Sequence, residues 1–289
     1  MRIFADDLGE PEGPVLLPDG TWAVVEMRPD RGHVTQLTDE GRSRRVLAKT
    51  GRPNGLAVDA DGVLWITESM NPPSLLRLRP GGEPETLLTA AGDDPFLFPN
   101  DLCFGPDGAL YMTDSGFFRP GLADIPEPER VKVKVDGRVF RIDRETLGIT
   151  RIDSWIPMAN GIAFGPDNDL YVSASFSGMV YRYRWDGSGF GPREDFANVR
   201  NPEKRDVIGR PDGMAFAENG DLYVTVAGQS DVTVVRPDGT IGSRIQLEEP
   251  NPTNVAFGPA GSQQIYVTAK EIGRLEVHDV GVDGLPLMG

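Results

Sequence analysis

Six polar residues recur along the chain in the same short context, each at the start of an apolar run. Four are asparagines and two are acids, so together they offer oxygen ligands without His or Cys. Such a donor set favours hard cations, Ca²⁺ first and Mg²⁺ or Mn²⁺ next, with Zn²⁺ and Fe²⁺ as further options. Two carboxylates would also balance the charge of one divalent ion. These anchor residues are Glu12, Asn54, Asn100, Asn160, Asp212 and Asn254.

The anchor residues lie 42 to 60 positions apart, and each begins a repeat of strands and turns. In "RPNGLAVDADGVLWITE" (52–68), for example, the anchor is followed by an apolar strand, a turn and a second apolar strand. Repeats of roughly 40–50 residues that contain only strands and turns are typical of β-propeller blades. The sequence therefore predicts an all-β, six-bladed β-propeller with four antiparallel strands per blade, as one domain over residues 1–289.

The sixth repeat holds only three strand-like segments, "NVAFG", "QIYVTA" and "GRLEVHD". The N-terminal "RIFAD" belongs to no other repeat and would supply the fourth strand. Pairing the two ends of the chain in this way closes the ring and covers an otherwise exposed strand edge.

The first strand of a propeller blade lines the central channel, so all six anchors are expected to ring one mouth of that channel. The ends of the second strands return to the same face, and Glu68 is one of these ends. An alternative is that the anchors only satisfy backbone groups at strand corners, as Asn and Asp often do. That alternative explains the four asparagines, but it does not explain why Glu12 and Asp212 break the pattern.

Composition narrows the class of partner. The chain has 29 Lys and Arg against 44 Asp and Glu, a formal net charge of −15, which argues against nucleic acid or an anionic membrane as the main partner.

A single cysteine, Cys103, rules out an internal disulfide and is expected to be a buried thiol. Since the N-terminus lacks a signal-peptide core and no stretch approaches a membrane span, we expect a cytoplasmic protein that acts on a small molecule. The sequence does not indicate an oligomeric state.

Five phrases, in order, resemble the gluconolactonase, senescence-marker-protein and luciferin-regenerating-enzyme family of six-bladed propellers. They are "PEGPVLLPDG", "RPNGLAVDADG", "PNDLCFGPDGALYMTD", "NGIAFGPDNDLYVS" and "RPDGMAFAENGDLYVT". The resemblance covers nearly the whole chain and implies one divalent metal at the channel mouth. It implies Glu12, Asn160 and Asp212 as ligands, with Asn100 as a fourth ligand or as a partner of substrate or metal-bound water.

The same resemblance places Asn54, Asn254, Asp101 and Glu68 among substrate contacts or residues behind the ligands. It also implies hydrolysis of a lactone, in which the cation polarises the carbonyl group and Asp212 is the base or the nucleophile. Some members hold a polyol with an Arg-x-Asn-Asp phrase, which is Phe98-Pro99-Asn100-Asp101 here. Sugar lactones and hydrophobic lactones both remain candidate substrates.

Three other functions stay open. One is a phosphotriesterase-like activity, since diisopropylfluorophosphatase has a similar propeller and oxygen-ligand set. Another is a non-catalytic propeller that binds a protein or peptide. The two converging acids argue against this function. The third is a strictosidine-synthase-like condensing enzyme, which needs no metal. Histidine catalysis is not expected, because neither His33 nor His278 adjoins an anchor residue.

The longest interval between anchors, from Asn100 to Asn160, contains an insertion at residues 115–136. We expect it on the anchor face, where long loops are more often functional than idle. Its Phe117 and Phe118 would cover a substrate. The alternative is a solvated excursion with an extra hairpin.

Overall fold

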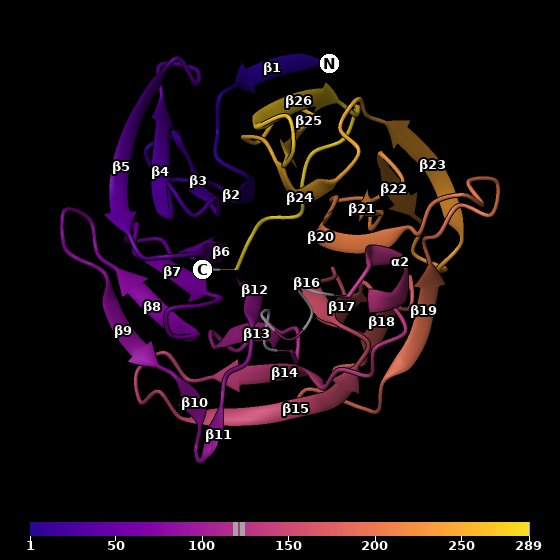
Figure 1. The fold of residues 1–289 in the computed structure, drawn as a ribbon, viewed down its shortest axis with the longest axis horizontal. Helices are drawn as coiled ribbons and strands as arrows, with labels where there is room; N and C mark the ends of the chain where they lie inside the picture. The colour runs from indigo at the N-terminus through magenta and orange to yellow at the C-terminus, as the bar shows by residue number, and fades with distance from the viewer. Residues whose placement is uncertain (118–120, 122–124, 289) are drawn as a thin grey trace.

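A computed structural model of the chain describes residues 1–117, 121 and 125–288, and it consists of six four-stranded antiparallel sheets around a central axis (Figure 1). The predicted all-β, six-bladed propeller is confirmed. Each sheet runs from an inner strand at the axis to an outer strand at the rim.

Blades 1 to 3 contain, in chain order, β2 (Pro11–Leu16), β3 (Trp22–Glu26), β4 (His33–Thr38) and β5 (Ser43–Lys49); β6 (Pro53–Val58), β7 (Leu64–Glu68), β8 (Ser74–Leu78) and β9 (Glu85–Leu88); and β12 (Pro99–Phe104), β13 (Leu110–Asp114), β14 (Gly137–Ile142) and β15 (Ile149–Ile156). Blades 4 and 5 contain β16 (Ala159–Phe164), β17 (Leu170–Ala174), β18 (Met179–Tyr183) and β19 (Glu194–Asn198); and β20 (Arg210–Phe216), β21 (Leu222–Ala227), β22 (Asp231–Val235) and β23 (Ile241–Gln246).

Blade 6 joins the two ends of the chain. Its strands β24 (Pro252–Phe257), β25 (Gln264–Ala269) and β26 (Arg274–Asp279) are completed by β1 (Arg2–Ala5), which pairs antiparallel with β26. The predicted closure of the ring by the N-terminal strand is therefore confirmed.

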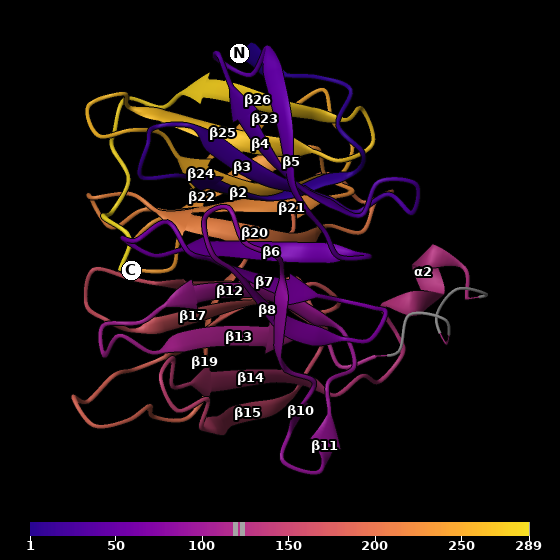
Figure 2. The same ribbon diagram turned by 90° about the vertical axis from the view of Figure 1, so that its left-hand side faces the viewer.

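Small elements among the described residues also lie outside the blades. The insertion carries a short helix, α2 (Glu127–Arg130), which projects from one face of the molecule (Figure 2). A two-stranded hairpin of β10 (Ala90–Ala91) and β11 (Asp94–Pro95) precedes blade 3, and the repeat pattern does not predict this hairpin. No helix of the described residues is long and apolar enough to cross a membrane.

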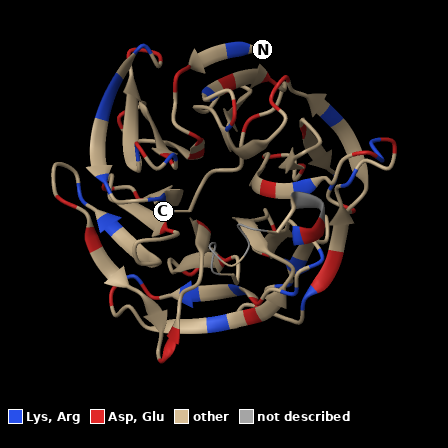
Figure 3. Ribbon diagram, viewed as in Figure 1, with Lys and Arg blue, Asp and Glu red and all other residues tan. Residues whose placement is uncertain are grey.

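The hydrophobic core lies between neighbouring blades. At five of the blade interfaces an aromatic side chain of one second strand packs on an aromatic side chain of a neighbouring blade, and such pairs contribute about 0.5–1.5 kcal/mol each beyond their burial. The charged residues gather on the outer strands and loops (Figure 3). The aromatic pairs are Trp22–Tyr266, Trp65–Phe104, Tyr111–Phe164, Tyr171–Phe216 and Tyr223–Phe257.

After β26 the chain crosses the end of the channel on the face opposite α2 (Figures 1 and 2). The Leu285 amide donates to the Phe216 carbonyl at 2.9 Å, and Met288 packs beside Phe104 and Phe164 at the ends of inner strands. This tail covers the mouth that the anchor residues do not face.

Candidate active site

Every inner strand has a β-bulge at its anchor residue. A bulge leaves residues unpaired with the neighbouring strand and redirects their side chains. Five of the anchors lie between the paired positions of their inner strands. Glu12 pairs with Val25, and the break in register directly follows it. The register breaks lie between Glu12 and Val15, Pro53 and Leu56, Pro99 and Leu102, Ala159 and Ile162, Pro211 and Met214, and Pro252 and Val255.

Buried hydroxyl groups of the second strands fill these bulges. The Thr67 hydroxyl accepts the Gly55 amide at 2.7 Å and donates to the Asn100 carbonyl of the next blade. The Ser173 hydroxyl likewise donates to the Asp212 carbonyl at 2.8 Å. The backbone of these anchors is thus held by the preceding blade, which leaves the side chains to face the channel.

Glycine follows the anchor where two inner strands approach most closely. A Cβ atom at Gly161 would lie 2.3 Å from the Asp212 carbonyl oxygen, and one at Gly213 would lie 2.0 Å from Asn254 Oδ1. Side chains do not fit at these positions. The Asn-Gly phrase at a strand mouth therefore marks a channel-facing amide followed by a close contact between blades, rather than a hairpin turn.

Three acids meet near the axis. Glu12 and Asp212 line the same pocket, while Asp101 lies next to them beside Asn254. Asn254 Nδ2 donates to Glu12 Oε2 at 2.9 Å and reaches Asp101 Oδ2 at 3.5 Å. The acids predicted to share the channel mouth are therefore close together, although 200 residues separate Glu12 from Asp212 in the sequence.

Burial makes this acidic cluster costly without a counter-ion. Burial, and then the charges of Asp212 and Asp101, raise the pKa of Glu12 well above its ordinary value. Burial likewise raises the pKa of Asp101 to about 7 and the pKa of Asp212 to about 7. Lys270 and Arg210 lie close enough to oppose the shift at Asp212. In the absence of a cation the cluster therefore holds protons at neutral pH.

Serine side chains orient two of the anchor amides. Asn100 Nδ2 donates to Ser115 Oγ, and Asn160 Nδ2 donates to Ser175 Oγ, both at 3.0 Å. The hydroxyl group of each serine donates to a main-chain carbonyl of the next blade, at 2.8 Å for Ser115 and 2.7 Å for Ser175. Because a hydroxyl group has one proton to donate, it can only accept from the amide. The Oδ1 atoms consequently face away from the serines. Asn160 Oδ1 is buried and has no hydrogen-bond partner among the described residues.

These observations fit a hard cation. Glu12, Asn160 and Asp212 supply oxygen atoms, Asn160 Oδ1 lacks a partner, and a divalent ion would offset the repulsion that raises the carboxyl pKa values. Asn100 presents the same amide geometry one blade away. Over residues 1–117, 121 and 125–288, no group of three or more His, Cys, Asp or Glu side chains is placed to hold a metal, so carboxamides must complete the set.

The anchor face is hollowed into a pocket of about 600 Å³. Its lining combines polar, cationic and apolar side chains, and a mixture of apolar surface with a few polar groups is usual for small-molecule sites. Phe98 and Phe117 stack in one wall with ring centres 4.8 Å apart, so Phe117 is placed as expected. The anchor residues in the lining are Glu12, Asn54, Asn100, Asn160 and Asp212; the cations are Arg52, Arg130, Arg210 and Lys270; and further apolar side chains are Met27, Val131, Met158 and Phe176.

Some expected contacts lie elsewhere. Glu68 does not line the pocket, because its Oε1 accepts the backbone amides of Arg52 at 2.8 Å and Met70 at 3.1 Å. Glu68 therefore holds the backbone that directly precedes the inner strand β6. Its position at the end of a second strand did not reveal this structural role. Asp101 and Asn254 contact Glu12 or each other rather than the open pocket. Phe118 lies outside the described residues.

The sequence itself contains a signal for these supporting hydroxyl groups. A Thr or Ser stands at the same place in the second strand of five blades, within the phrases "WIT", "YMT", "YVS", "YVT" and "YVT". A polar residue repeated inside an otherwise apolar strand needs a buried partner. That partner is the bulge beside each anchor.

Replacing Ser175 by alanine is expected to weaken calcium binding by about 10–100-fold, the usual cost of losing a group that orients a ligand. Without Ser175 Oγ the Asn160 amide loses the acceptor that fixes its orientation in the pocket. Isothermal titration with Ca²⁺ measures the effect. Ser177→Ala is the matched control, because Ser177 Oγ donates to the Ala174 carbonyl and touches no anchor. Equal affinities for Ser175→Ala and wild type would contradict the assignment.

The metal-free protein is expected to lose stability as the pH rises from about 4 to 7. Carboxyl groups of the unfolded chain titrate near pH 4, whereas burial raises the pKa of Asp101 to about 7 in the folded chain. In this range the folded protein keeps a proton that the unfolded chain has lost, so the free energy of unfolding falls with rising pH. Each pH unit between the two pKa values is worth about 1.4 kcal/mol.

The contribution of Asp101 to this pH dependence is measured by thermal unfolding of wild type and Asp101→Asn in EDTA. Comparing the two proteins separates Asp101 from the other acids. The difference in unfolding free energy between the two proteins should move in favour of the variant as the pH rises. A difference that is constant between pH 4 and 8 would contradict the proposed cost of ionising Asp101.

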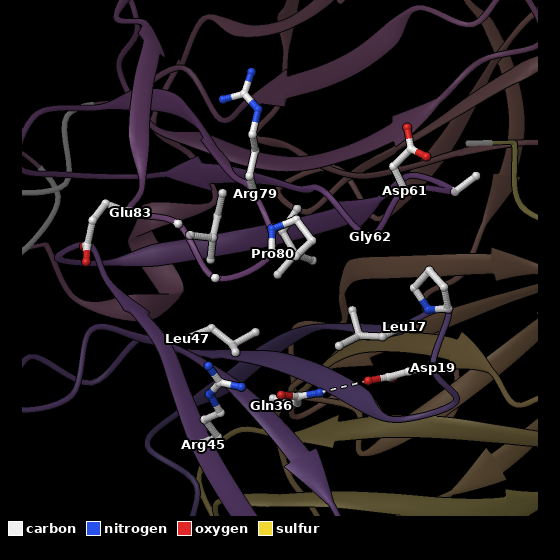
Figure 4. A pocket seen from close by; sticks show the side chains of 16 residues that line it. Leu17, Asp19, Gln36, Arg45, Leu47, Asp61, Gly62, Arg79, Pro80 and Glu83 are labelled. Carbon is white, nitrogen blue, oxygen red and sulfur yellow. Dashed lines mark hydrogen bonds between the residues drawn. The ribbon is translucent and has the colours of Figure 1, made fainter.

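A second pocket, of about 540 Å³, lies between blades 1 and 2 at the turns after their inner strands (Figure 4). Leu17 and Leu47 form part of its apolar surface, and Gln36 Nε2 donates to Asp19 Oδ2 at 3.3 Å. None of the anchor residues lines it. It is therefore not the candidate active site.

Known proteins resemble this chain along most of its length. The gluconolactonase of Zymomonas mobilis is 27% identical over 288 residues, which covers 93% of this chain and 78% of that protein. The pentonolactonase XacC of Haloferax volcanii is 30% identical over 263 residues, covering 89% and 80%. Among solved structures, the calcium-binding protein regucalcin of Agrobacterium tumefaciens shares the fold, with a TM-score of 0.79, 19% identity and coverage of 99% and 95%.

The family described as SMP-30/Gluconolactonase/LRE-like region matches residues 11–271, from the inner strand of blade 1 to the end of the second strand of blade 6. That span includes all six anchors and their bulges. The chain belongs to the SMP-30/gluconolactonase/LRE-like family.

Proposed function

We propose that this protein is a divalent-cation-dependent hydrolase that opens a lactone in the anchor-face pocket. The observation that carries the proposal is the convergence of Glu12, Asn160 and Asp212, from blades 1, 4 and 5, on the floor of one pocket. Two relatives that align with 89% or more of the chain are lactonases by name, which supports the same reaction class. The calcium-binding structural neighbour supports Ca²⁺ as the cation to test first.

Glu12, Asn160 and Asp212 would hold the cation, and Asn100 would be a fourth ligand or would bind the attacking water. When bound, the cation would polarise the lactone carbonyl and stabilise the negative charge that develops on its oxygen. The stacked Phe98 and Phe117 side chains would cover one side of a bound lactone ring. Apolar side chains beside polar anchor residues suit a lactone, whose ring is apolar and whose carbonyl group is polar.

In this proposal Asp212 accepts a proton from the attacking water. As water oxygen bonds to the carbonyl carbon, the Asp212 carboxylate takes one water proton. The bond between the carbonyl carbon and the ring oxygen then breaks, and the ring oxygen takes a proton to become the hydroxyl of the product hydroxy acid. Lys270 and Arg210 favour the ionised form that this role needs, since their charges oppose the rise in the pKa of Asp212.

Asp212 would instead be a nucleophile if its own oxygen attacked the carbonyl carbon and formed an acyl-enzyme. A single turnover in water labelled with oxygen-18 separates the two routes. Label found only in the product indicates a base, whereas label in the Asp212 carboxyl group indicates a nucleophile.

A pH-indicator screen of sugar, aliphatic and aromatic lactones tests the function itself. The protein is first treated with EDTA and then supplied with Ca²⁺, Mg²⁺, Mn²⁺ or Zn²⁺. We expect at least one lactone to be opened when a cation is restored and none in EDTA. A folded protein that opens no lactone with any cation would show the proposal to be wrong. A phosphotriester in the same plates tests the phosphotriesterase alternative.

A further inference from the structure

Ring opening needs a proton donor as well as a proton acceptor. In an alkyl lactone the ring oxygen departs as an alkoxide, whose conjugate acid is about as weak as water. Expelling such a group is slow unless an acid delivers a proton as the bond breaks. Asp212 is occupied with the proton of the attacking water, so a second group is required.

The pocket offers few candidates. Its lining, among the described residues, includes no His, Cys or Tyr. Three of its four cations are arginines, which do not give up a proton in proteins. Glu271 Oε1 is occupied by a hydrogen bond that it accepts from Asn251 Nδ2. Amides and the Thr253 hydroxyl are too weakly acidic to serve.

Lys270 is the remaining N–H acid of the lining. It directly follows β25 in blade 6, next to the blade that carries Asp212, and it lines the same pocket. Its charge is the largest of those that lower the pKa of Asp212, so the two groups are close. Among the residues that the structure describes, none forms a hydrogen bond or an ion pair with its ammonium group. The half-buried side chain therefore has its three N–H donors available to a ligand.

We propose that Lys270 is the catalytic acid that protonates the departing ring oxygen, an inference that rests on the hydrolase function proposed above. As the bond from the carbonyl carbon to the ring oxygen breaks, its electron pair goes to that oxygen, which takes a proton from the Lys270 ammonium group. Lys270 is left as a neutral amine and Asp212 as a protonated acid. Transfer of the Asp212 proton to Lys270, directly or through water, restores both groups.

The leaving group provides a selective test. Dihydrocoumarin and δ-valerolactone share a six-membered lactone ring, but the first expels a phenolate, whose conjugate acid has a pKa of about 10, and needs no acid. Lys270→Met is expected to lower kcat for δ-valerolactone by about 100-fold or more and kcat for dihydrocoumarin by less than about threefold. Methionine preserves much of the apolar stem, and circular dichroism and thermal unfolding confirm the fold.

Lys270→Arg separates proton donation from charge. Arginine keeps the positive charge beside Asp212 but does not give up a proton, so this variant should behave like Lys270→Met on δ-valerolactone. Equal losses on both lactones, or rescue of δ-valerolactone opening by arginine, would overturn the assignment. Lys49→Met, on the outer strand β5, is the surface control. If the wild type opens neither lactone nor any other in the screen, the proposed function fails instead.

Discussion

Replacing Asp212 by asparagine is expected to abolish lactone opening, with a loss in kcat of at least about 10³-fold. Asparagine has nearly the same shape but cannot take a proton from water. It also removes one of the two carboxylates that would balance the cation. The fold should survive, because the neighbouring blade holds the residue through its carbonyl group, to which the Ser173 hydroxyl donates at 2.8 Å.

Initial rates at saturating cation and lactone measure this effect. Asp238→Asn is the matched control, because Asp238 lies in an exposed turn of the same blade and bonds to Thr240. The control should keep wild-type kcat. An Asp212→Asn variant with more than about a tenth of wild-type kcat would remove Asp212 from the chemical step.

Replacing Glu12 by glutamine is expected to act in opposite directions on cation binding and on the stability of the metal-free protein. The affinity for Ca²⁺ should fall by about 10²-fold or more, since one of two charged ligands becomes neutral. The metal-free variant should unfold at a higher temperature than metal-free wild type. Burial and the charges of Asp212 and Asp101 oppose ionisation of Glu12, and a neutral amide has no such cost.

Glutamine can still accept the hydrogen bond that Asn254 Nδ2 donates to Glu12, so the variant leaves no buried donor without a partner. Calorimetric unfolding with EDTA and with excess Ca²⁺ gives both quantities. Glu10→Gln, two residues earlier and outside the pocket lining, controls for the change in net charge. A lower unfolding temperature for metal-free Glu12→Gln would contradict the picture of an uncompensated acidic cluster.

The propeller and the convergence of the anchors could be predicted because topology alone determines them. Six phased repeats of strand and turn have one closed arrangement, and inner strands in such a ring must bring equivalent positions to one mouth. Glu12 and Asp212 were therefore placed together without any distance information. The same reasoning placed Phe117 at the pocket, because a long insertion between the second and third strands must emerge on that face.

The supporting interactions could not be predicted in this way because they depend on local geometry. A bulge at each anchor follows from a break in strand register, and a propensity pattern does not encode register. Glu68 stands at the same strand end as residues that face the pocket, yet its carboxylate turns to the backbone amide of Arg52. Only the direction of a side chain separates the two roles.

The glycine positions show the same limit. Asn54-Gly55 and Asn160-Gly161 look like turn signals, but the glycines are required by the neighbouring blade. At the equivalent position of blade 3 the chain has Asp101 instead, and this substitution adds the third acid to the cluster. The sequence indicated Asp101 as a substrate contact or a residue behind the ligands, but not that it would be buried beside Glu12.

We propose that one cation lies between acids from blades 1 and 5. In a crystal grown with Mn²⁺, the anomalous scattering of the metal gives its position. We expect one strong anomalous peak at the channel mouth, within coordination distance of oxygen atoms of Glu12, Asn160 and Asp212. An anomalous map with no peak among these three side chains, in a crystal grown at saturating Mn²⁺, would contradict it.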